Sequence, residues 1–269
     1  MTSVQRMLER VGWLPARALP IALAGLLLAV GACQSHKPMI PARLVSPYGT
    51  TRAVIWSVAP PRNESGVSYV DELKVGDDLV QQIGQVTGIS CLPLNRTLAA
   101  MQVLGLASID TPAQARALAH ALGADAVVVS SVTAWKMYDP PVIGMNLALF
   151  GADASSLSMA GDSRALAASA SGNQTGGQAS GQVARNGPLS VVSEVLDASN
   201  HGILLRVQEF GEGRSQPDSG LGWLAYTKSM TLYTQFACHR MVELLLDAER
   251  HRLAPAAESG APAKNEPPR

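Results

Sequence analysis

The sequence predicts an α/β protein with three layers, in which flanking helices cover a mixed sheet of four to five strands. Three observations predict this class. Short β-branched runs alternate with helical segments between residues 53 and 150. A turn at residues 139–141 separates two strand-like runs and predicts one antiparallel hairpin. An amphipathic segment at residues 222–253 predicts a long C-terminal helix.

The first strand is predicted at AVIWSVAP, residues 53–60, which is apolar, rich in β-branched residues and stopped by Pro60 and Pro61. A polar loop, RNESG, follows it. Residues 68–86 then carry apolar side chains at helical spacing, with Ser68 and Asp71 as a start signal and Gly88 after the end. ISCLPL, residues 89–94, predicts the second strand.

The clearest element signals lie between residues 95 and 152. A short helix is expected from residue 95 to about Gly105. A second helix begins at Thr111, the N-cap, with Pro112 in its first position and Gln114 completing a capping box, and it ends at Gly123. ADAVVVSSVTAW, residues 124–135, predicts a strand, and residues 137–152 predict the antiparallel strand that returns.

Regular patterning stops at residues 151–188, where alanine, serine, glycine and glutamine dominate, and we expect a disordered insertion there. A further strand is predicted at 189–199, a helix at 200–210 and one continuous helix at 222–253. We therefore expect a single α/β domain formed by residues 52–150 and 189–252, followed by a disordered tail at 253–269.

The N-terminal residues resemble a bacterial lipoprotein signal. Basic residues precede an uncharged, mostly apolar run at 18–32, which is shorter than the about 20 residues that span a bilayer. VGAC, residues 30–33, resembles a lipobox, which implies cleavage after Ala32 and acylation of Cys33. Two or three acyl chains anchor a protein stably, whereas one does not. The alternative is an ordinary cleaved signal peptide with an unrelated cysteine.

On this interpretation residues 1–32 are a signal peptide, and residues 33–51 are the lipidated cysteine and a flexible tether. Lipoproteins of this type that stay at the inner membrane tend to carry aspartate after the cysteine. Gln34 occupies that position here. We therefore expect a lipid-anchored protein of the bacterial envelope, at the outer membrane and facing the periplasm. An exported location also permits a disulfide, and Cys91 and Cys238 either pair or remain two buried thiols.

Composition and motifs argue against several function classes. Lys plus Arg and Asp plus Glu number 21 each, and no basic run with interleaved aromatics occurs, so we expect no nucleic-acid partner. No G-x-S-x-G elbow, HExxH motif or P-loop is present. Cys238 and His239 are adjacent, which is the wrong spacing for a helical metal pair. We expect no cofactor, no metal and no catalysis.

An acidic group lies at Asp71, Glu72, Asp77 and Asp78. Paired carboxylates can act as general acid and base. At the start of an amphipathic helix they more often stabilise the helix dipole and favour solubility.

Two loops are candidates for binding a protein partner. The first follows the first strand and contains Arg62, Asn63 and Glu64, at the carboxyl end of a strand, where open α/β sheets often bind ligands. The second is the turn with Tyr138, Asp139 and Pro140, a rigid exposed type of turn that is used in protein contacts. The alternative for each is a turn selected only for its geometry.

Residues 53–150 resemble a group of envelope lipoproteins that includes the curli-secretion lipoprotein CsgG, the LpoB-type activators of penicillin-binding proteins and the amino-terminal domain of TolB. Pro61, Asn63 and Ser65 match the loop after the first strand, and residues 123–125, GAD, match the start of a later strand. These motifs are structural, so the resemblance implies the fold more than a function.

We expect a membrane-anchored periplasmic lipoprotein that acts as a non-catalytic binding or adaptor module and activates or scaffolds an envelope assembly. Its partners would be the bilayer, through acylated Cys33, and an envelope protein or a second copy of itself. The alternative is an oligomeric secretion or transport component of the curli-secretion type.

Overall fold

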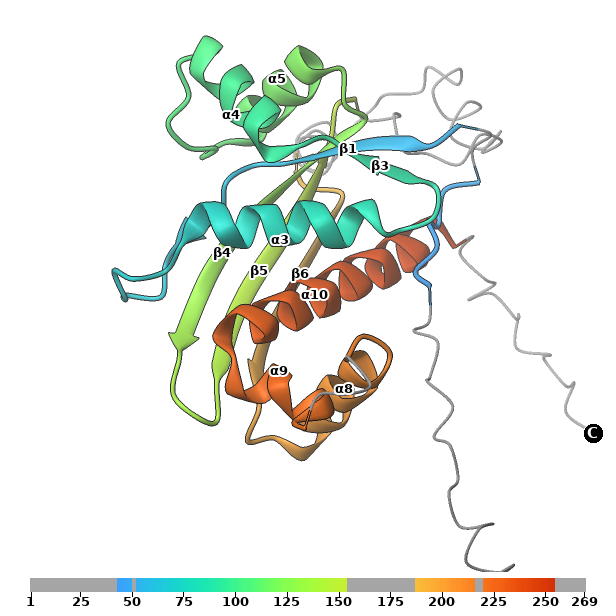
Figure 1. Ribbon diagram of the computed structural model, residues 1–269. Coiled ribbons are helices and arrows are strands. Elements are labelled where there is room, and N and C mark those ends of the chain that lie inside the picture. The colour runs from blue at the N-terminus through green and yellow to red at the C-terminus, as the bar shows by residue number, and fades with distance from the viewer. Residues whose placement is uncertain (1–42, 50–51, 154–186, 216–219, 255–269) are drawn as a thin grey trace, which may run out of the picture. The chain divides into compact units, whose positions relative to one another are not determined.

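A mixed sheet of six strands organises the domain (Figure 1). The computed structural model describes residues 43–49, 52–153, 187–215 and 220–254. The strand order is β3-β1-β4-β5-β6, and β2 pairs with β4 beyond the end of β1. The strands are β1 (Val54–Val58), β2 (Arg62–Asn63), β3 (Ile89–Cys91), β4 (Ala126–Lys136), β5 (Val142–Gly151) and β6 (Ser190–Asp197).

Helices cover both faces of this sheet (Figure 1). On one face α3 and α10 pack side by side, with α8 and α9 beyond them, and on the other face α4 and α5 cover the region of β1 and the start of β4. The helices are α3 (Glu72–Gly84), α4 (Leu94–Val103), α5 (Pro112–Leu122), α8 (His201–Glu212), α9 (Ala225–Lys228) and α10 (Met230–Leu253), and a 3-10 turn, η1 (Gly222–Leu224), precedes α9.

Helical crossovers explain the parallel half of the sheet. β1 is parallel to both β3 and β4, with α3 leading to β3 and α4 and α5 leading to β4. The tight turn after β4 makes β5 antiparallel, and β6 is antiparallel to β5. The predicted mixed sheet with flanking helices and a C-terminal helix is confirmed. The sheet has one strand more than we expected, because β2 is a two-residue strand inside the predicted loop.

Two apolar cores lie on opposite faces of the sheet. The larger one joins β1, β4, β5 and β6 to α3, α8 and α10, with Trp56 fully buried. The smaller one joins α4 and α5 to Val127 and its neighbours. Burial of such side chains contributes about 1.5–3 kcal/mol each, so these cores are the main source of stability.

The predicted helix boundaries at 111–123 are confirmed in detail. The Thr111 hydroxyl accepts a hydrogen bond from the Gln114 amide, and the Gln114 side chain accepts one from the Thr111 amide, which is a complete capping box. Gly123 has φ of 63°, the left-handed conformation that ends the helix. For α3 the cap is Asp71, whose carboxylate accepts from the Lys74 amide.

The continuous helix predicted over 222–253 is interrupted. A 3-10 turn and the short α9 come first, and Ser229 then adopts an extended backbone with φ of −120°. Its hydroxyl accepts from the Leu232 amide, so Ser229 is the N-cap of α10. A serine preference for caps over helix interiors explains the break, which the apolar periodicity alone does not reveal.

Residues 43–49, assigned to a tether from the sequence, lie against the domain. Val45 forms a parallel bridge with Thr87, and Tyr48 is buried. The Tyr48 hydroxyl donates to the Glu249 carboxylate of α10 at 2.6 Å. Residues 33–42 of the predicted tether lie outside the described residues.

The edges of the predicted insertion also belong to the domain. Gly151 ends β5, and the Ala152 amide donates to the Asp125 carbonyl. Residues 154–186, most of the tail, and the predicted signal peptide with Ala32 and Cys33 lie outside the described residues. Within the described ranges, no helix has the length and apolar character to cross a membrane. Cys91 and Cys238 are both free thiols.

Candidate partner-binding groove

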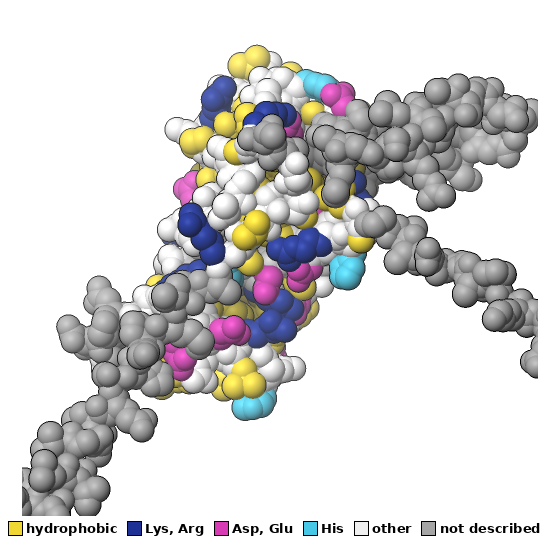
Figure 2. All heavy atoms as spheres, turned by 90° about the vertical axis from the view of Figure 1, so that its right-hand side faces the viewer, with side chains coloured by type: hydrophobic (Ala, Val, Ile, Leu, Met, Phe, Trp, Pro, Cys, Tyr) yellow, Lys and Arg dark blue, Asp and Glu magenta, His cyan; other side chains and the backbone are white. Residues whose placement is uncertain are grey.

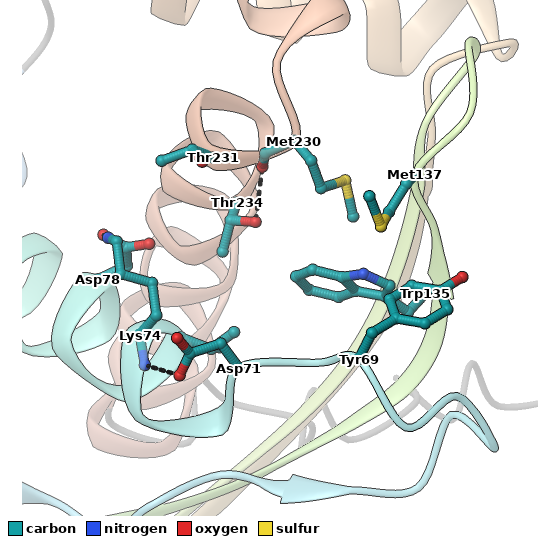
Figure 3. A pocket seen from close by; sticks show the side chains of 10 residues that line it. Tyr69, Asp71, Lys74, Asp78, Trp135, Met137, Met230, Thr231 and Thr234 are labelled. Atoms are coloured by element: carbon teal, nitrogen blue, oxygen red, sulfur yellow. Dashed lines mark hydrogen bonds and ion pairs between the residues drawn. The ribbon is translucent and has the colours of Figure 1, made fainter.

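The two predicted loops both lie next to the C-terminal half of β4. β2 runs parallel to β4, with Arg62 opposite Ser131 and Asn63 opposite Val132. The chain after β2 therefore continues beside the last residues of β4, which lead into the turn at 138–141. Between this end of β4 and the starts of α3 and α10 lies a groove (Figure 3).

The groove has a volume of about 260 Å³ and draws its walls from three distant parts of the chain. The segment before α3 and its first turns supply one wall, the end of β4 supplies the second, and the first turns of α10 supply the third (Figure 3). The lining residues are Tyr69, Asp71, Lys74, Val75, Asp78, Trp135, Met137, Met230, Thr231 and Thr234.

A β-bulge directs Trp135 into this groove. The β4–β5 register shifts between Val132 and Ala134, so Thr133 is an extra residue in β4. Because side chains alternate along a strand, this insertion moves Trp135 to the face covered by α3 and α10. Gly144 lies opposite, and a Cβ there would come within 2.6 Å of Thr133 Oγ1. The glycine therefore permits the bulge.

The outer part of the groove is apolar and exposed. Tyr69 is 53% exposed and Met137 is 51% exposed, and Tyr138, next in the chain, is 78% exposed. In Figure 3 the side chains of Met137 and Met230 lie on the same side of the Trp135 indole. Exposed aromatic and methionine side chains around a hollow are typical of protein-contact surfaces.

The inner wall is acidic. Asp78 is 1% exposed, and one of its carboxylate oxygens, Oδ1, accepts from the Lys74 ammonium at 2.5 Å. Burial raises the pKa of the Asp78 carboxyl above its ordinary value, although the Lys74 hydrogen bond and charge oppose the shift. The other oxygen, Oδ2, and Trp135 Nε1 are buried and have no hydrogen-bond partner among the described residues.

The first predicted loop is held by its own side chains. Asn63 Nδ2 donates to the Val67 carbonyl at 2.6 Å, and its Oδ1 accepts from the amide and the hydroxyl of Ser65. These hydrogen bonds hold the loop closed, so Asn63 and Ser65 of the matched motif have a structural role. Arg62 is exposed and pairs with Asp110 at 2.7 Å, and Glu64 is exposed. Arg62 and Asn63 line a separate hollow of about 260 Å³.

The second predicted loop borders the groove. Tyr138 and Asp139 are exposed, and Pro140 is half-buried. Asp139 pairs with Lys228, at the end of α9, and the Asp139–Pro140 peptide bond is cis. The turn is therefore joined to the segment that leads into α10.

The GAD motif at residues 123–125, which carries part of the family resemblance, has a structural role. Asp125 accepts two hydrogen bonds from the Arg52 guanidinium, at 2.6 and 2.9 Å, and a third from the Ile55 amide. Burial would raise the pKa of Asp125, but these bonds outweigh it and lower the pKa. The motif thus fixes the start of β1 beside β4.

Trp135, Met137 and Met230 line the groove, although no sequence pattern indicates a site at these residues. The strand pattern shows Trp135 at the end of an apolar run, but not the bulge that decides which face it occupies. The acidic group was identified, and only Asp78 of its four members is buried. The helical periodicity indicates that Asp78 is buried, because Asp78 lies on the same helical face as Val75 and Leu79.

The described ranges hold no group of three or more His, Cys, Asp or Glu side chains placed to bind a metal. Cys238 is buried, and burial raises the pKa of its thiol well above the ordinary value. Burial and the charge of Arg214 lower the pKa of His239 to about 4.

Charged side chains of both signs are mixed on the surface shown in Figure 2. Basic and acidic groups lie next to one another across the middle of this face, and hydrophobic side chains occur between them.

Comparisons with known proteins identify similar structures but no family. No family model matches the chain, and a search of curated proteins found no match. Among solved structures, the chain is similar to the LpoB C-terminal domain from Salmonella enterica, with 23% identity over 38% of this chain and 76% of that one, and a TM-score of 0.30.

Two further structures resemble larger parts of the chain. Lipoprotein GNA1162 from Neisseria meningitidis is 15% identical over 56% of this chain and 92% of that one, with a TM-score of 0.36. The hypothetical protein CT253 from Chlamydia trachomatis is 9% identical over 73% of this chain and 98% of that one, with a TM-score of 0.37.

Proposed function

We propose that the protein is a lipid-anchored lipoprotein of the bacterial envelope that acts as a non-catalytic binding module for an envelope protein. The observation that carries this proposal is the VGAC sequence at 30–33, which follows a short apolar run and ends in Cys33. Acylation of Cys33 would place the domain at a membrane surface, at the outer membrane and facing the periplasm. Gln34, in place of aspartate, supports the outer membrane.

The groove supports a binding role for the domain. It combines exposed aromatic and thioether side chains with a buried carboxylate, at one end of the sheet. Protein interfaces are enriched in aromatic residues and methionine at their centres. The exposed Tyr138 and the loop with Arg62, Asn63 and Glu64 extend the surface available to a partner.

Metabolic labelling tests the anchor. Cells that express the full chain are labelled with a palmitate analogue, with and without globomycin, beside a Cys33→Ser variant. We expect label on the wild type, accumulation of the uncleaved precursor in globomycin, and no label on the variant. Label on Cys33→Ser would exclude acylation at Cys33.

Crosslinking from the groove tests the binding role. A photoreactive amino acid replaces Tyr138 or, as a control on a distant surface, Val103, which is 87% exposed on α4. We expect a discrete crosslink to one envelope protein from position 138 and none from position 103. A peptidoglycan synthase in that crosslink would support an activator role. Equal crosslinking from both positions would contradict a role for this end of the sheet.

One feature favours the second candidate, an oligomeric secretion or transport component. Val191 and Val195 on β6 are each 59% exposed, on the sheet face that α4 and α5 cover elsewhere. Paired copies could cover these valines. Mass measurement of the acylated protein in detergent separates the candidates, because a ring contains many copies, whereas a binding module requires only one.

A further inference from the structure

The groove holds a carboxylate oxygen that the fold leaves without a donor. The Asp78 side chain is 2% exposed, and Lys74 contacts only its Oδ1 atom, while Oδ2 is buried with no partner in the described part of the chain. An unsatisfied buried carboxylate oxygen is costly, so its retention needs an explanation. The helix dipole does not supply one, since Asp78 lies in the second turn of α3.

The Trp135 indole is a second unsatisfied group in the same groove. Its Nε1 is a donor, it is buried, and no acceptor among the described residues lies within hydrogen-bond distance. The groove therefore presents one acceptor and one donor that have no partner within the fold (Figure 3). A ligand that satisfies both must offer a donor and an acceptor.

Charge and aromatic character favour a cationic ligand. Among the residues that line the groove, Asp71 and Asp78 are acidic and Lys74 is basic, so this wall has one more carboxylate than it has ammonium groups. Trp135 and Tyr69 offer aromatic surface, which attracts cations through the ring quadrupole. A guanidinium suits this site better than an ammonium, because it is planar, stacks on aromatic rings and donates several hydrogen bonds to a carboxylate.

We propose that the groove binds an arginine side chain from a peptide segment of the envelope partner. The guanidinium donates to Asp78 Oδ2 and packs against Trp135, and the aliphatic stem lies along Met137 and Met230. A backbone carbonyl of the same segment accepts from Trp135 Nε1. This assignment deepens the proposed function, on which it rests, by naming the chemistry of the partner.

Titration with blocked tripeptides tests the assignment. The full chain with Cys33→Ser is purified in mild detergent with 15N-labelled tryptophan, and Trp135→Phe identifies the Trp135 indole resonance. The probes are N-acetyl-Gly-Arg-Gly-amide and its citrulline analogue, which has the same shape and no charge. We expect a saturable shift of the Trp135 resonance with arginine and at least tenfold weaker binding of citrulline. Equal binding of both peptides, or no shift with either, would overturn the proposal.

A matched pair of variants locates the contact. Asp78→Asn and Asp77→Asn each remove one charge from α3, but Asp77 is exposed and does not line the groove. We expect Asp78→Asn to weaken arginine binding at least tenfold and Asp77→Asn to weaken it less than twofold. Equal losses of affinity in the two variants would show that arginine responds to the overall negative charge of α3 and does not contact Asp78. If Asp78→Asn does not fold, the citrulline comparison on the wild-type groove remains decisive.

The outcomes separate this inference from the proposed function. If the partner crosslink at position 138 is unchanged in Asp78→Asn, the arginine assignment fails while the binding module stands. If the tripeptide binds but Cys33 is not acylated, the groove assignment stands while the anchor fails.

Discussion

Tyr48 donates a hydrogen bond from its hydroxyl to the buried carboxylate of Glu249, across 201 residues of sequence, at 2.6 Å. Ser190 and Arg252 also donate to this carboxylate. Burial would raise the pKa of Glu249, but the bonds from Arg252, Ser190 and Tyr48 outweigh it and lower the pKa. Through this carboxylate the segment before β1, the start of β6 and the end of α10 are joined.

Removal of the Tyr48 hydroxyl should therefore destabilise the domain. We expect Tyr48→Phe to lower the free energy of unfolding by about 1.5–3 kcal/mol, because one bond to a buried charged acceptor is lost. Urea denaturation followed by far-UV circular dichroism measures the change. Tyr138→Phe, at an exposed tyrosine, should change it by less than about 0.5 kcal/mol. Equal effects of the two substitutions would contradict a structural role for the bond.

A Cβ at Gly144 should disturb the bulge that orients Trp135. It would meet Thr133 Oγ1 at 2.6 Å and Ala134 Cβ at 3.0 Å, so we expect Gly144→Ala to destabilise the domain by about 1–3 kcal/mol. The Trp135 indole resonance should also shift.

The control for Gly144 is Gly84, at the end of α3, where a Cβ meets nothing within 4 Å. Gly84→Ala should be neutral or stabilising, by up to about 1 kcal/mol, because alanine is the better helix former. A harmless Gly144→Ala substitution would show that the bulge does not depend on the glycine.

Loss of the Thr111 hydroxyl should weaken α5 at its start. We expect Thr111→Ala to cost about 1 kcal/mol, because the Gln114 amide loses its acceptor, and Thr111→Ser to retain most of the stability. The midpoint of urea unfolding of each variant gives the comparison. If Thr111→Ser lowers the midpoint as much as Thr111→Ala does, the loss of stability comes from the missing methyl group and not from the missing cap.

His239 should make stability depend on pH between about 6.5 and 4. Burial and Arg214 lower its pKa to about 4, while Glu243 opposes the shift, so the unfolded chain binds a proton at a higher pH than the folded one. The neutral form therefore stabilises the fold above pH 6.5, and this stability is lost as the pH falls through 4.

The pH effect should be measured as a difference between wild type and His239→Gln. We expect the wild type to lose about 2 kcal/mol relative to the variant over this range. Thermal unfolding at half-unit steps of pH provides the measurement. A difference that does not vary with pH would mean that His239 titrates alike in the folded and unfolded chain.

Local signals allowed much of the secondary structure to be predicted. Thr111, Pro112, Gln114 and Gly123 act through bonds within a few residues of each other, so the limits of α5 follow from the sequence. The break at Ser229 is also local, but the apolar pattern continues through it, and the pattern alone predicted one helix. The two-residue β2 was hidden in a polar loop, because its pairing depends on β4.

The sequence by itself determined the α/β class, most element boundaries and the prediction of a lipid anchor at Cys33, because these depend on periodicity and short-range spacing. Only the tertiary structure decided where Asp78 and Trp135 lie. The burial of Asp78 requires α10 to pack on α3, and the side of Trp135 depends on a one-residue bulge opposite Gly144. Such contacts join residues far apart in the chain, so their geometry follows from packing and register and not from local sequence.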